Sequence, residues 1–364
     1  MQLLAVPGVH AWARWQPERN LAFSSHLLVR DGGNVAFDPL PIDAAEEAAI
    51  AALGGVALIL LTNRDHERGA AALRERFGAR IFASRAEAAS FQLNVDAVFD
   101  AVPAAFPSAR SSGPVEVVPG VTALALDGAK TPGEVVFYLP ERRAAIVGDA
   151  LIGSPAGALS FLSDEKIADP KTLSLSLRQL WALQPQALLL GDGTSLFAGV
   201  DDALATLLEA RGGPAVNRIN LDELTWEPFD DVGGLYRGEA GEIGLFIGAR
   251  DLGYQAVHLP PGTRFCPLHA HDREEEVFFV VEGEPSIRTL RGTLRLRAGD
   301  IMAFPVGDRG AHQLLNESDA PCTVILLGSD YVDEVAYYPD SQKIGLRRRG
   351  LRMRVDRLDY FDGE

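Results

Sequence analysis

Four residues toward the carboxy-terminal end of the chain have the types and spacing of a metal site. His269 and His271 are two residues apart, Glu276 follows five residues later, and His312 comes after a further stretch. Because residues two apart on a strand point to one face, both histidines would face the same interior. Imidazole nitrogens and a carboxylate oxygen suit Fe, Mn, Ni, Zn or Cu. The four residues therefore predict a site for one divalent transition metal of undecided identity.

A cysteine and two glutamates lie close in sequence to these four residues and are candidates for further members of the site. Cys266 is an odd number of residues from His269, so on a regular strand it points the opposite way and is not expected to be a ligand. Glu274 and Glu275 precede Glu276, and consecutive glutamates are typical of a solvated strand entry. Glu274 shares the parity of Glu276, which leaves a pocket position open as the alternative.

The sequence around these residues divides into two parts of different pattern. Up to about residue 212, short β-rich runs alternate with helical stretches, which favours layers of helices against a sheet. From residue 221 onward, short strands and close turns predict an all-β barrel. We expect domains at 1–212 and 221–364, joined by a linker at 213–220. Expected helices are 43–53, 67–77, 171–183 and 201–211; expected strands in the second part are 242–247, 255–259, 275–282, 293–297 and 322–327.

Composition limits the classes of partner and the compartment. The 364 residues carry 34 Lys plus Arg against 50 Asp plus Glu, a formal net charge of -16. Such an acidic surface repels phosphate backbones and anionic lipid headgroups, so nucleic acid and membrane are not expected partners. Two cysteines in so long a chain do not form a disulfide scaffold, and no signal-peptide order is found. These features favour a cytoplasmic protein.

Two groups of residues in the second part resemble the two motifs of the cupin family. The first group is Gly262, His269, His271, Glu276 and Gly283, and the second is Gly299, Pro305, Gly307, His312 and Asn316. The resemblance implies a jelly-roll barrel with the two motif histidines, the glutamate and the later histidine as metal ligands, and it implies a homodimer. The activity stays open among sugar isomerisation, oxygenation, decarboxylation and ligand sensing, because pocket residues outside the motifs decide it.

Landmarks in the first part resemble the metallo-β-lactamase fold, which implies an αββα sandwich. They are, in order, Asp38, the apolar run 58–62, Thr131-Pro132-Gly133, Gly148-Asp149 and Gly191-Asp192-Gly193. The family's metal-binding His-x-His-x-Asp-His run is replaced by residues 63–68, Asn-Arg-Asp-His-Glu-Arg. Of the residue types expected at the ligand positions only Asp149 is present, and Arg68 and Lys130 place positive charge where a metal would be repelled. No metal is expected in this domain.

The replacements themselves form a pattern of opposite charges. We expect a half-buried ion network in a vestigial site, with Arg64 as a further partner for excess carboxylates. His66 is out of register with the ligand positions and is interpreted as a helix-entry or surface residue. The expected network comprises Asp65, Glu67, Arg68, Lys130, Asp149 and Asp192.

Two functions from different classes fit these predictions. The first is a metal-dependent enzyme of oxygenase or isomerase type that acts on a small polar molecule, rather than a hydrolase of the zinc β-lactamase kind. The second is a non-catalytic metabolite sensor or scaffold. The basic run from Arg347 to Arg357 is interpreted as an edge strand with one solvated face.

Overall fold

The computed structural model describes residues 1–101, 115–212, 217–231, 233–249, 251–331, 333–347 and 351–354. The chain divides into two compact units, one extending to Val216 and one that includes residues from Asn217 onward. Residues 213–216 of the expected linker lie outside the described residues, as do 348–350 and 355–364 of the carboxy-terminal tail. The expected domain boundaries therefore stay a prediction.

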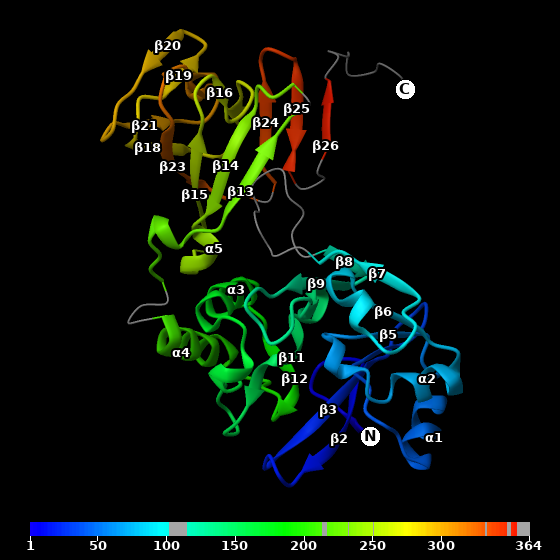
Figure 1. The fold of residues 1–364 in the computed structure, drawn as a ribbon. Helices are drawn as coiled ribbons and strands as arrows, with labels where there is room; N and C mark the ends of the chain where they lie inside the picture. The colour runs from blue at the N-terminus through cyan, green and yellow to red at the C-terminus, as the bar shows by residue number, and fades with distance from the viewer. Residues whose placement is uncertain are drawn as a thin grey trace, which may run out of the picture. The chain divides into compact units, whose positions relative to one another are not determined.

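The amino-terminal unit is built on one continuous folded sheet (Figure 1). Strand β2 (Val9–Gln16) pairs with β3, and β1 (Gln2–Leu3) pairs with β2. The remaining order is β7 (Ala97–Phe99), β6 (Arg80–Ser84), β5 (Leu58–Leu60), β4 (Val35–Phe37), β3 (Leu21–Leu28), β12 (Ala187–Gly193), β11 (Ala144–Gly153), β10 (Val135–Leu139), β9 (Val121–Ala125) and β8 (Val115–Val118).

Alternating apolar side chains give this sheet two buried faces. Leu28 and Phe137 belong to a core between the two halves of the sheet, where the Phe37 and Phe137 rings lie 5.4 Å apart. Leu27 belongs to a second core beneath the helices, because successive strand residues point to opposite faces. Helices α1 (Ala44–Ala52) and α2 (Ala70–Phe77) cover one outer face, and α3 (Pro170–Ala182) and α4 (Val200–Gly212) cover the other. The unit is the αββα sandwich that the sequence predicts.

Local signals account for where the helices begin. Asp43 caps α1 and forms a capping box with Glu46, as a helix from about residue 43 requires. Helix α2 begins at Ala70, three residues later than expected, because Arg68 has a positive φ of 27° that a right-handed helix does not contain; Arg64–His66 form the separate 3-10 helix η1. This extra turn carries the residues that follow β5 over the end of the sheet.

The carboxy-terminal unit consists of three sheets, which form the jelly-roll barrel that the sequence predicts (Figure 1). The first contains β13 (Trp226–Asp230), β14 (Arg237–Glu242), β15 (Leu252–Leu259), β23 (Cys322–Ser329), β18 (Glu276–Glu282) and β21 (Ile301–Phe304). The second contains β16 (Thr263–Arg264), β22 (His312–Asn316), β19 (Ser286–Thr289) and β20 (Gly292–Arg295); the third contains β17 (Ala270–His271), β24 (Val335–Tyr338), β25 (Lys343–Leu346) and β26 (Leu351–Arg354).

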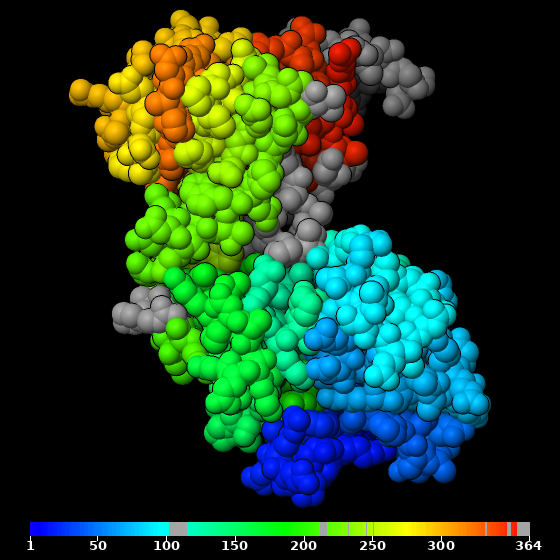
Figure 2. All heavy atoms as spheres, in the orientation of Figure 1, coloured from blue at the N-terminus to red at the C-terminus, as the bar shows by residue number. Residues whose placement is uncertain are grey.

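One segment of this unit that was predicted to be a strand contains a helix instead. The segment 242–247 was expected to be a strand, but β14 ends at Glu242 and Gly244–Ile247 form helix α5. Ile243 and Ile247 pack there in an apolar cluster against the β15 residue Ala256, so the apolar run covers a sheet face instead of extending the sheet. Strand β20 is exposed along its length, and its hairpin with β19 lies at the surface of the unit (Figure 2). Strand β26 is an edge strand, as the basic tail predicts, but all four of its residues are exposed, so the expectation of a single solvated face is wrong.

Candidate metal centre

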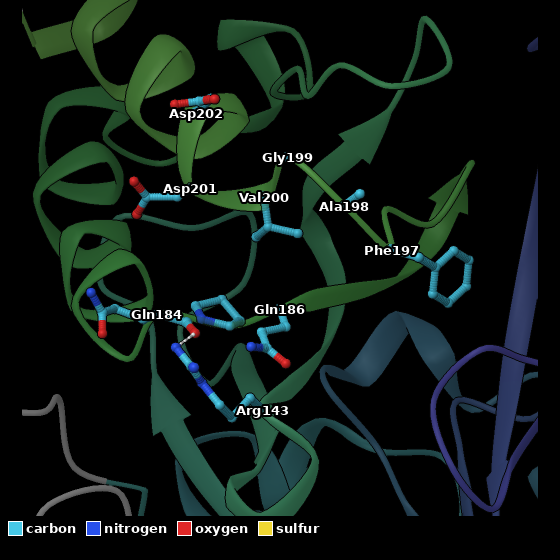
Figure 3. Close-up of a pocket in the computed structure, with 10 residues that line it drawn as sticks. Arg143, Gln184, Gln186, Phe197, Ala198, Gly199, Val200, Asp201 and Asp202 are labelled. Atoms are coloured by element: carbon cyan, nitrogen blue, oxygen red, sulfur yellow. Dashed lines mark hydrogen bonds between the residues drawn. The ribbon is translucent and has the colours of Figure 1, made fainter.

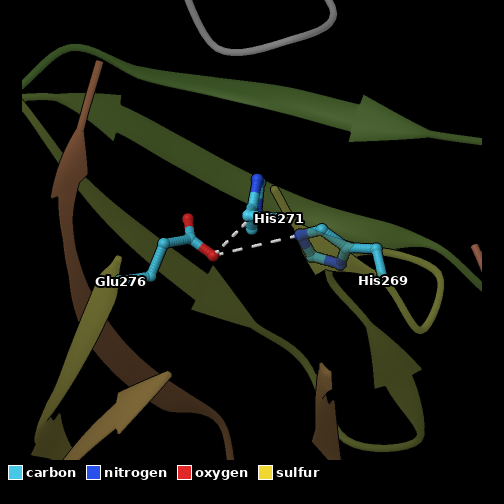
Figure 4. Close-up of side chains that lie close together, drawn as sticks. All are labelled: His269, His271 and Glu276. Carbon is cyan, nitrogen blue, oxygen red and sulfur yellow. Dashed lines mark ion pairs between the residues drawn. The ribbon is translucent and has the colours of Figure 1, made fainter. Parts of the chain in front are cut away.

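The structure brings the four predicted metal ligands of the carboxy-terminal unit together around one oxygen atom. Oε2 of Glu276 lies 2.9 Å from Nε2 of His312, 3.2 Å from Nε2 of His271 and 3.9 Å from Nε2 of His269. Figure 4 shows His269 and His271 turned toward the carboxylate of Glu276. Three imidazole nitrogens, two from one segment and one from another, thus point at one carboxylate.

Strand pairing places these side chains. His269 forms an isolated β-bridge with His312, and Ala270–His271 pair with β24 as β17. Glu276 begins β18, which lies between β21 and β23 in the sheet that starts with β13. The shared direction of His269 and His271 agrees with their spacing of two residues.

The electrostatics of the cluster reflect burial opposed by close opposite charge. Burial, with the neighbouring His312, lowers the pKa of His269 to about 3. For His271 burial also acts to lower the pKa, but the hydrogen bond and charge of Glu276 outweigh it and the net shift is upward. Burial alone would raise the pKa of Glu276, yet its contacts with His271 and His312 bring it well below the ordinary value. The carboxylate is therefore held ionised, beside a neutral His269 and a His271 that protonates more readily than a free imidazole.

The donor atoms of this cluster fit a divalent transition metal. Nε2 of His271, Nε2 of His312 and Oε2 of Glu276 are buried and lack a hydrogen-bond partner of good geometry among the described residues. Buried polar atoms are seldom left in this state, and an ion that accepts their lone pairs would satisfy all of them. The side chains of His269 and Glu276 are 13% and 21% exposed, so parts of both reach the surface although Oε2 of Glu276 does not.

Residues near the cluster correct one sequence interpretation and support another. Cys266 is buried but belongs to neither of the potential metal-binding groups formed by the described residues. Glu274 was interpreted first as a solvated strand entry, and this is wrong: it is 2% exposed and is bound by Arg347. Strand β18 begins at Glu276, so Glu274 lies outside the strand and its burial follows from its contact with Arg347 instead of from strand parity. Glu334, which lies 3.3 Å from Nδ1 of His271, was missed because it is far along the chain and in no motif.

The amino-terminal unit carries a separate ion cluster at the carboxyl ends of its strands. Lys130 Nζ lies 2.6 Å from Asp65 Oδ2 and 2.8 Å from Asp149 Oδ2. Arg68 Nη2 lies 3.9 Å from Asp192 Oδ1, which is an ion pair but not a hydrogen bond. Five of the six residues expected in the network therefore lie in it.

Glu67 is the exception, and Arg64 does not replace it. Both carboxylate oxygens of Glu67 accept main-chain N–H groups, from Gln92 at 2.6 Å and Leu93 at 3.1 Å. Glu67 therefore fixes a loop instead of joining the network. The side chain of Arg64 is exposed, and its main-chain N–H donates to Glu87.

His66 lies at the centre of the amino-terminal cluster, which corrects its interpretation as a surface residue. It ends the short helix η1, but its side chain is buried between two aspartates. Nδ1 lies 2.9 Å from Asp38 Oδ2, and Nε2 lies 3.4 Å from Asp149 Oδ1. Burial opposes protonation, but Asp38 and then Asp149 raise the pKa of His66 to about 10. A buried imidazolium therefore links Asp38 to Asp149.

With His66 protonated, the charges of this cluster balance. Arg19 supplies a further cation, 3.9 Å from Asp192 Oδ2. Glu134, which the sequence did not single out, is buried nearby, and its burial and the charge of Asp149 raise its pKa to about 8. Glu134 is thus neutral at pH 7, and four cations face four carboxylates: Arg19, His66, Arg68 and Lys130 against Asp38, Asp65, Asp149 and Asp192.

A hollow on the amino-terminal unit lies apart from both clusters. Its volume is about 460 Å³, and its lining includes Arg143, Gln184, Phe197 and Asp201 (Figure 3). Arg143 donates a 2.8 Å hydrogen bond to the main-chain oxygen of Gln184 across its floor. None of the residues that line it belongs to either ion cluster, so the chemistry of the side chains, rather than surface shape, selects the candidate site.

The chain matches two known families over separate ranges. Residues 1–210 match the metallo-beta-lactamase superfamily, and residues 255–328 match the cupin domain. A hydroxyacylglutathione hydrolase from Acidiphilium cryptum (strain JF-5) is 32% identical over 216 residues, which cover 57% of this chain and 86% of that protein. Both family resemblances predicted from the motifs are thereby confirmed.

Similar solved structures cover one part of the chain each. A sugar phosphate isomerase from Silicibacter pomeroyi is 27% identical, covers 35% of this chain and 84% of its own, and has a TM-score of 0.32. A putative sugar phosphate isomerase from Acidithiobacillus ferrooxidans is 21% identical, covers 39% and 98%, and has a TM-score of 0.35. A protein in a di-iron-bound form is 25% identical, covers 55% and 96%, and has a TM-score of 0.38.

Proposed function

The chain belongs to the metallo-beta-lactamase superfamily and carries a cupin domain, and we propose that its activity resides in the cupin domain. There, His269, His271, Glu276 and His312 hold one divalent transition metal, which is Fe, Mn, Ni, Zn or Cu. The convergence of three Nε2 atoms on Glu276 Oε2 carries this proposal. When bound, such a metal supplies Lewis-acid or redox chemistry to a small polar molecule.

The residues of the site have separate tasks in this proposal. Glu276, held ionised, contributes the negative charge that a divalent cation requires. His269, whose low pKa keeps it neutral, offers its Nε2 lone pair without first losing a proton. The exposed edges of His269 and Glu276 mark the side from which a small molecule reaches the site.

The amino-terminal domain, in our proposal, has lost hydrolytic function. The hydroxyacylglutathione hydrolase from Acidiphilium cryptum is similar over this part, but this chain places Arg68, Lys130 and protonated His66 around Asp149 and Asp192. These three positive charges disfavour the binding of a metal cation at the same place. Among the described residues, groups of three potential ligand atoms close enough to share an ion occur in the carboxy-terminal unit alone.

Metal analysis of the purified full chain tests the proposal. We expect about one equivalent of metal after purification without chelators or affinity metals, and loss of it in His312→Ala. His258→Ala is the matched control, because His258 lies in the same domain and contacts Thr323 instead of the cluster. Metal-free wild-type protein that also fails to take up added Fe, Mn, Ni, Zn or Cu would overturn the proposal.

A sensor is the second candidate, and the same cluster would serve it by binding a metabolite without converting it. Incubating the metal-loaded chain with pooled small polar metabolites separates the two by mass spectrometry. A new product that is absent with His312→Ala supports the enzyme. Enrichment of an unchanged compound on the protein supports the sensor.

The proposal also covers the compartment, the oligomeric state and the partners of the protein. No helix among the described residues is long and apolar enough to cross a membrane. We place the protein in the cytoplasm as a homodimer that binds a small molecule, without nucleic-acid or membrane partners.

A further inference from the structure

The three histidines of the candidate metal centre differ in what their second ring nitrogen faces. Nδ1 of His269 lies 3.0 Å from the main-chain oxygen of Pro267, and Nδ1 of His312 lies 2.8 Å from that of Gly310. Each of these two rings therefore contacts a neutral carbonyl two residues earlier in the chain. Nδ1 of His271 instead lies 3.3 Å from Glu334 Oε1 and 3.5 Å from Glu274 Oε2, and it is buried with these charged groups as neighbours but without a hydrogen bond of good geometry among the described residues.

Both glutamates behind His271 are fixed by other parts of the chain. Glu334 is 2% exposed, and its two oxygens accept the main-chain N–H groups of Asp272 at 2.9 Å and Arg273 at 3.1 Å. Glu274 is equally buried and accepts from the main-chain N–H of Tyr331 at 2.8 Å. Carboxylates held in this way keep their position without help from the histidine.

Arg347 sets the charge of this pair. Its guanidinium binds both oxygens of Glu274, with Nη2 2.6 Å from Oε2, and its main-chain N–H donates to the main-chain oxygen of Glu334. Arg347 also pairs with Asp330 Oδ1 at 2.9 Å, so carboxylates outnumber this cation and net negative charge lies next to Nδ1 of His271. A hydrogen on Nδ1 would face this charge, and the ring's lone pair would then lie on Nε2, toward Glu276.

We propose that Glu334 and Glu274 are positioning residues whose negative charge keeps the ring hydrogen of His271 on Nδ1 and makes His271 a stronger metal ligand than His269 or His312. The inference rests on the proposed metal site. A carboxylate that accepts from the far nitrogen fixes the ring and raises the basicity of the ligating nitrogen, and its removal typically lowers metal affinity by about 10–100-fold. A carbonyl partner fixes the ring but adds no full charge.

The same three groups could be interpreted as a second metal site, since His271, Glu274 and Glu334 lie close enough to share an ion. The carboxylate oxygens of Glu274 and Glu334 already have other partners, which argues against a second metal site. Arg347 already supplies a cation to Glu274, and both oxygens of Glu334 accept main-chain N–H groups. A metal on Nδ1 would also require His271 to lose its last ring proton.

Metal affinity of the full chain, measured by competition with a coloured chelator using Co²⁺ or Zn²⁺, tests the inference. In Glu334→Gln we expect one metal per chain, bound about 10–100-fold more weakly, with an altered visible spectrum of the Co²⁺ form. Glu274→Gln should weaken binding less, because Arg347 offsets its charge. The matched control is Asp333→Asn, whose carboxylate is next to Glu334 but pairs with Arg273 at the surface.

The outcomes separate this inference from the proposed function. A wild-type chain that binds no metal overturns both. A wild-type chain that binds metal, with affinity and spectrum unchanged in both glutamine variants, overturns this inference alone, as does binding of two metals that falls to one in Glu334→Gln. Because a folding defect would also weaken binding, the melting temperature of each metal-free variant is measured, and the affinities are compared at a temperature below all of these melting points.

Discussion

His66 is joined to Asp38 by a contact of 2.9 Å between Nδ1 and Oδ2, and both side chains are buried at the end of the amino-terminal sheet. The other ring nitrogen, Nε2, lies 3.4 Å from Oδ1 of Asp149, which also binds Lys130. An imidazolium thus lies among carboxylates in a domain whose superfamily is named for metal-dependent members. We infer that this protonated ring joins Asp38, directly after strand β4, to Asp149 in strand β11 and needs no metal ion to do so.

Removing the charge at position 66 should destabilise the amino-terminal unit. His66→Gln leaves Asp38 and Asp149 as buried carboxylates without their shared cation, which typically costs about 3–5 kcal/mol. Hydrogen exchange of β11 and β12 in the full chain measures this free energy of opening. The control His10→Gln, on the half-buried strand β2, should change it by less than about 1 kcal/mol. Equal effects of the two substitutions would contradict the linking role.

The same cluster predicts how stability depends on pH. The folded-state pKa of His66 is about 10, above its unfolded value of 6.5, so its contribution is fully present below pH 6.5 and is lost as pH rises toward 10. Glu134, with a pKa raised from 4.5 to about 8, contributes fully below pH 4.5 and loses this contribution as pH rises toward 8. The unit should therefore become less stable from pH 5 to pH 10.

A substitution that removes the ionisation of Glu134 isolates one part of this dependence. Glu134→Gln should raise the free energy of opening at pH 8 by at least about 1 kcal/mol, since each pKa unit corresponds to about 1.4 kcal/mol. At pH 4, where the glutamic acid is neutral in either state, the variant and the wild type should agree. A pH-independent difference between them would assign the effect to packing instead of charge.

Metal should stabilise one unit and leave the other unchanged. Ligand at 100 times its dissociation constant adds about 2.7 kcal/mol to the stability of the state that binds it. We expect hydrogen exchange to slow in β18 and β22 when Co²⁺ is added, with no change in β11 and β12. In Asp149→Asn the slowing of β18 and β22 should persist, because Asp149 belongs to the other cluster. Slower exchange in β11 and β12 would place metal in the amino-terminal unit.

The sequence predicted the metal cluster more completely than the ion cluster. The histidine spacing and the order of the two motifs can be read directly from the sequence. They identified His269, His271, Glu276 and His312, although the strands β17, β18 and β22 belong to three sheets. His66 could not be assigned in the same way, because its partners Asp38 and Asp149 are supplied by other strands. A ligand-register argument excludes a metal ligand but does not reveal an ion pair formed by tertiary packing.

Groups that support a site from distant segments were also beyond the sequence. Glu334 and Arg347 reach His271 and Glu274 through pairing of β17 with β24 and of β24 with β25, which no spacing rule fixes. Glu67 shows the opposite case, since its charge suited the network while its oxygens are used by main-chain N–H groups of a loop. Main-chain partners are not visible in a pattern of side-chain types.

An anomalous difference map, recorded at the absorption edge of the metal found in the purified full chain, tests the central claim most directly. The account predicts one peak per chain, bounded by the Nε2 atoms of His269, His271 and His312 and by the carboxylate of Glu276. A peak beside Asp149 and Asp192, or metal-bearing crystals with no peak among the three histidines, would contradict it.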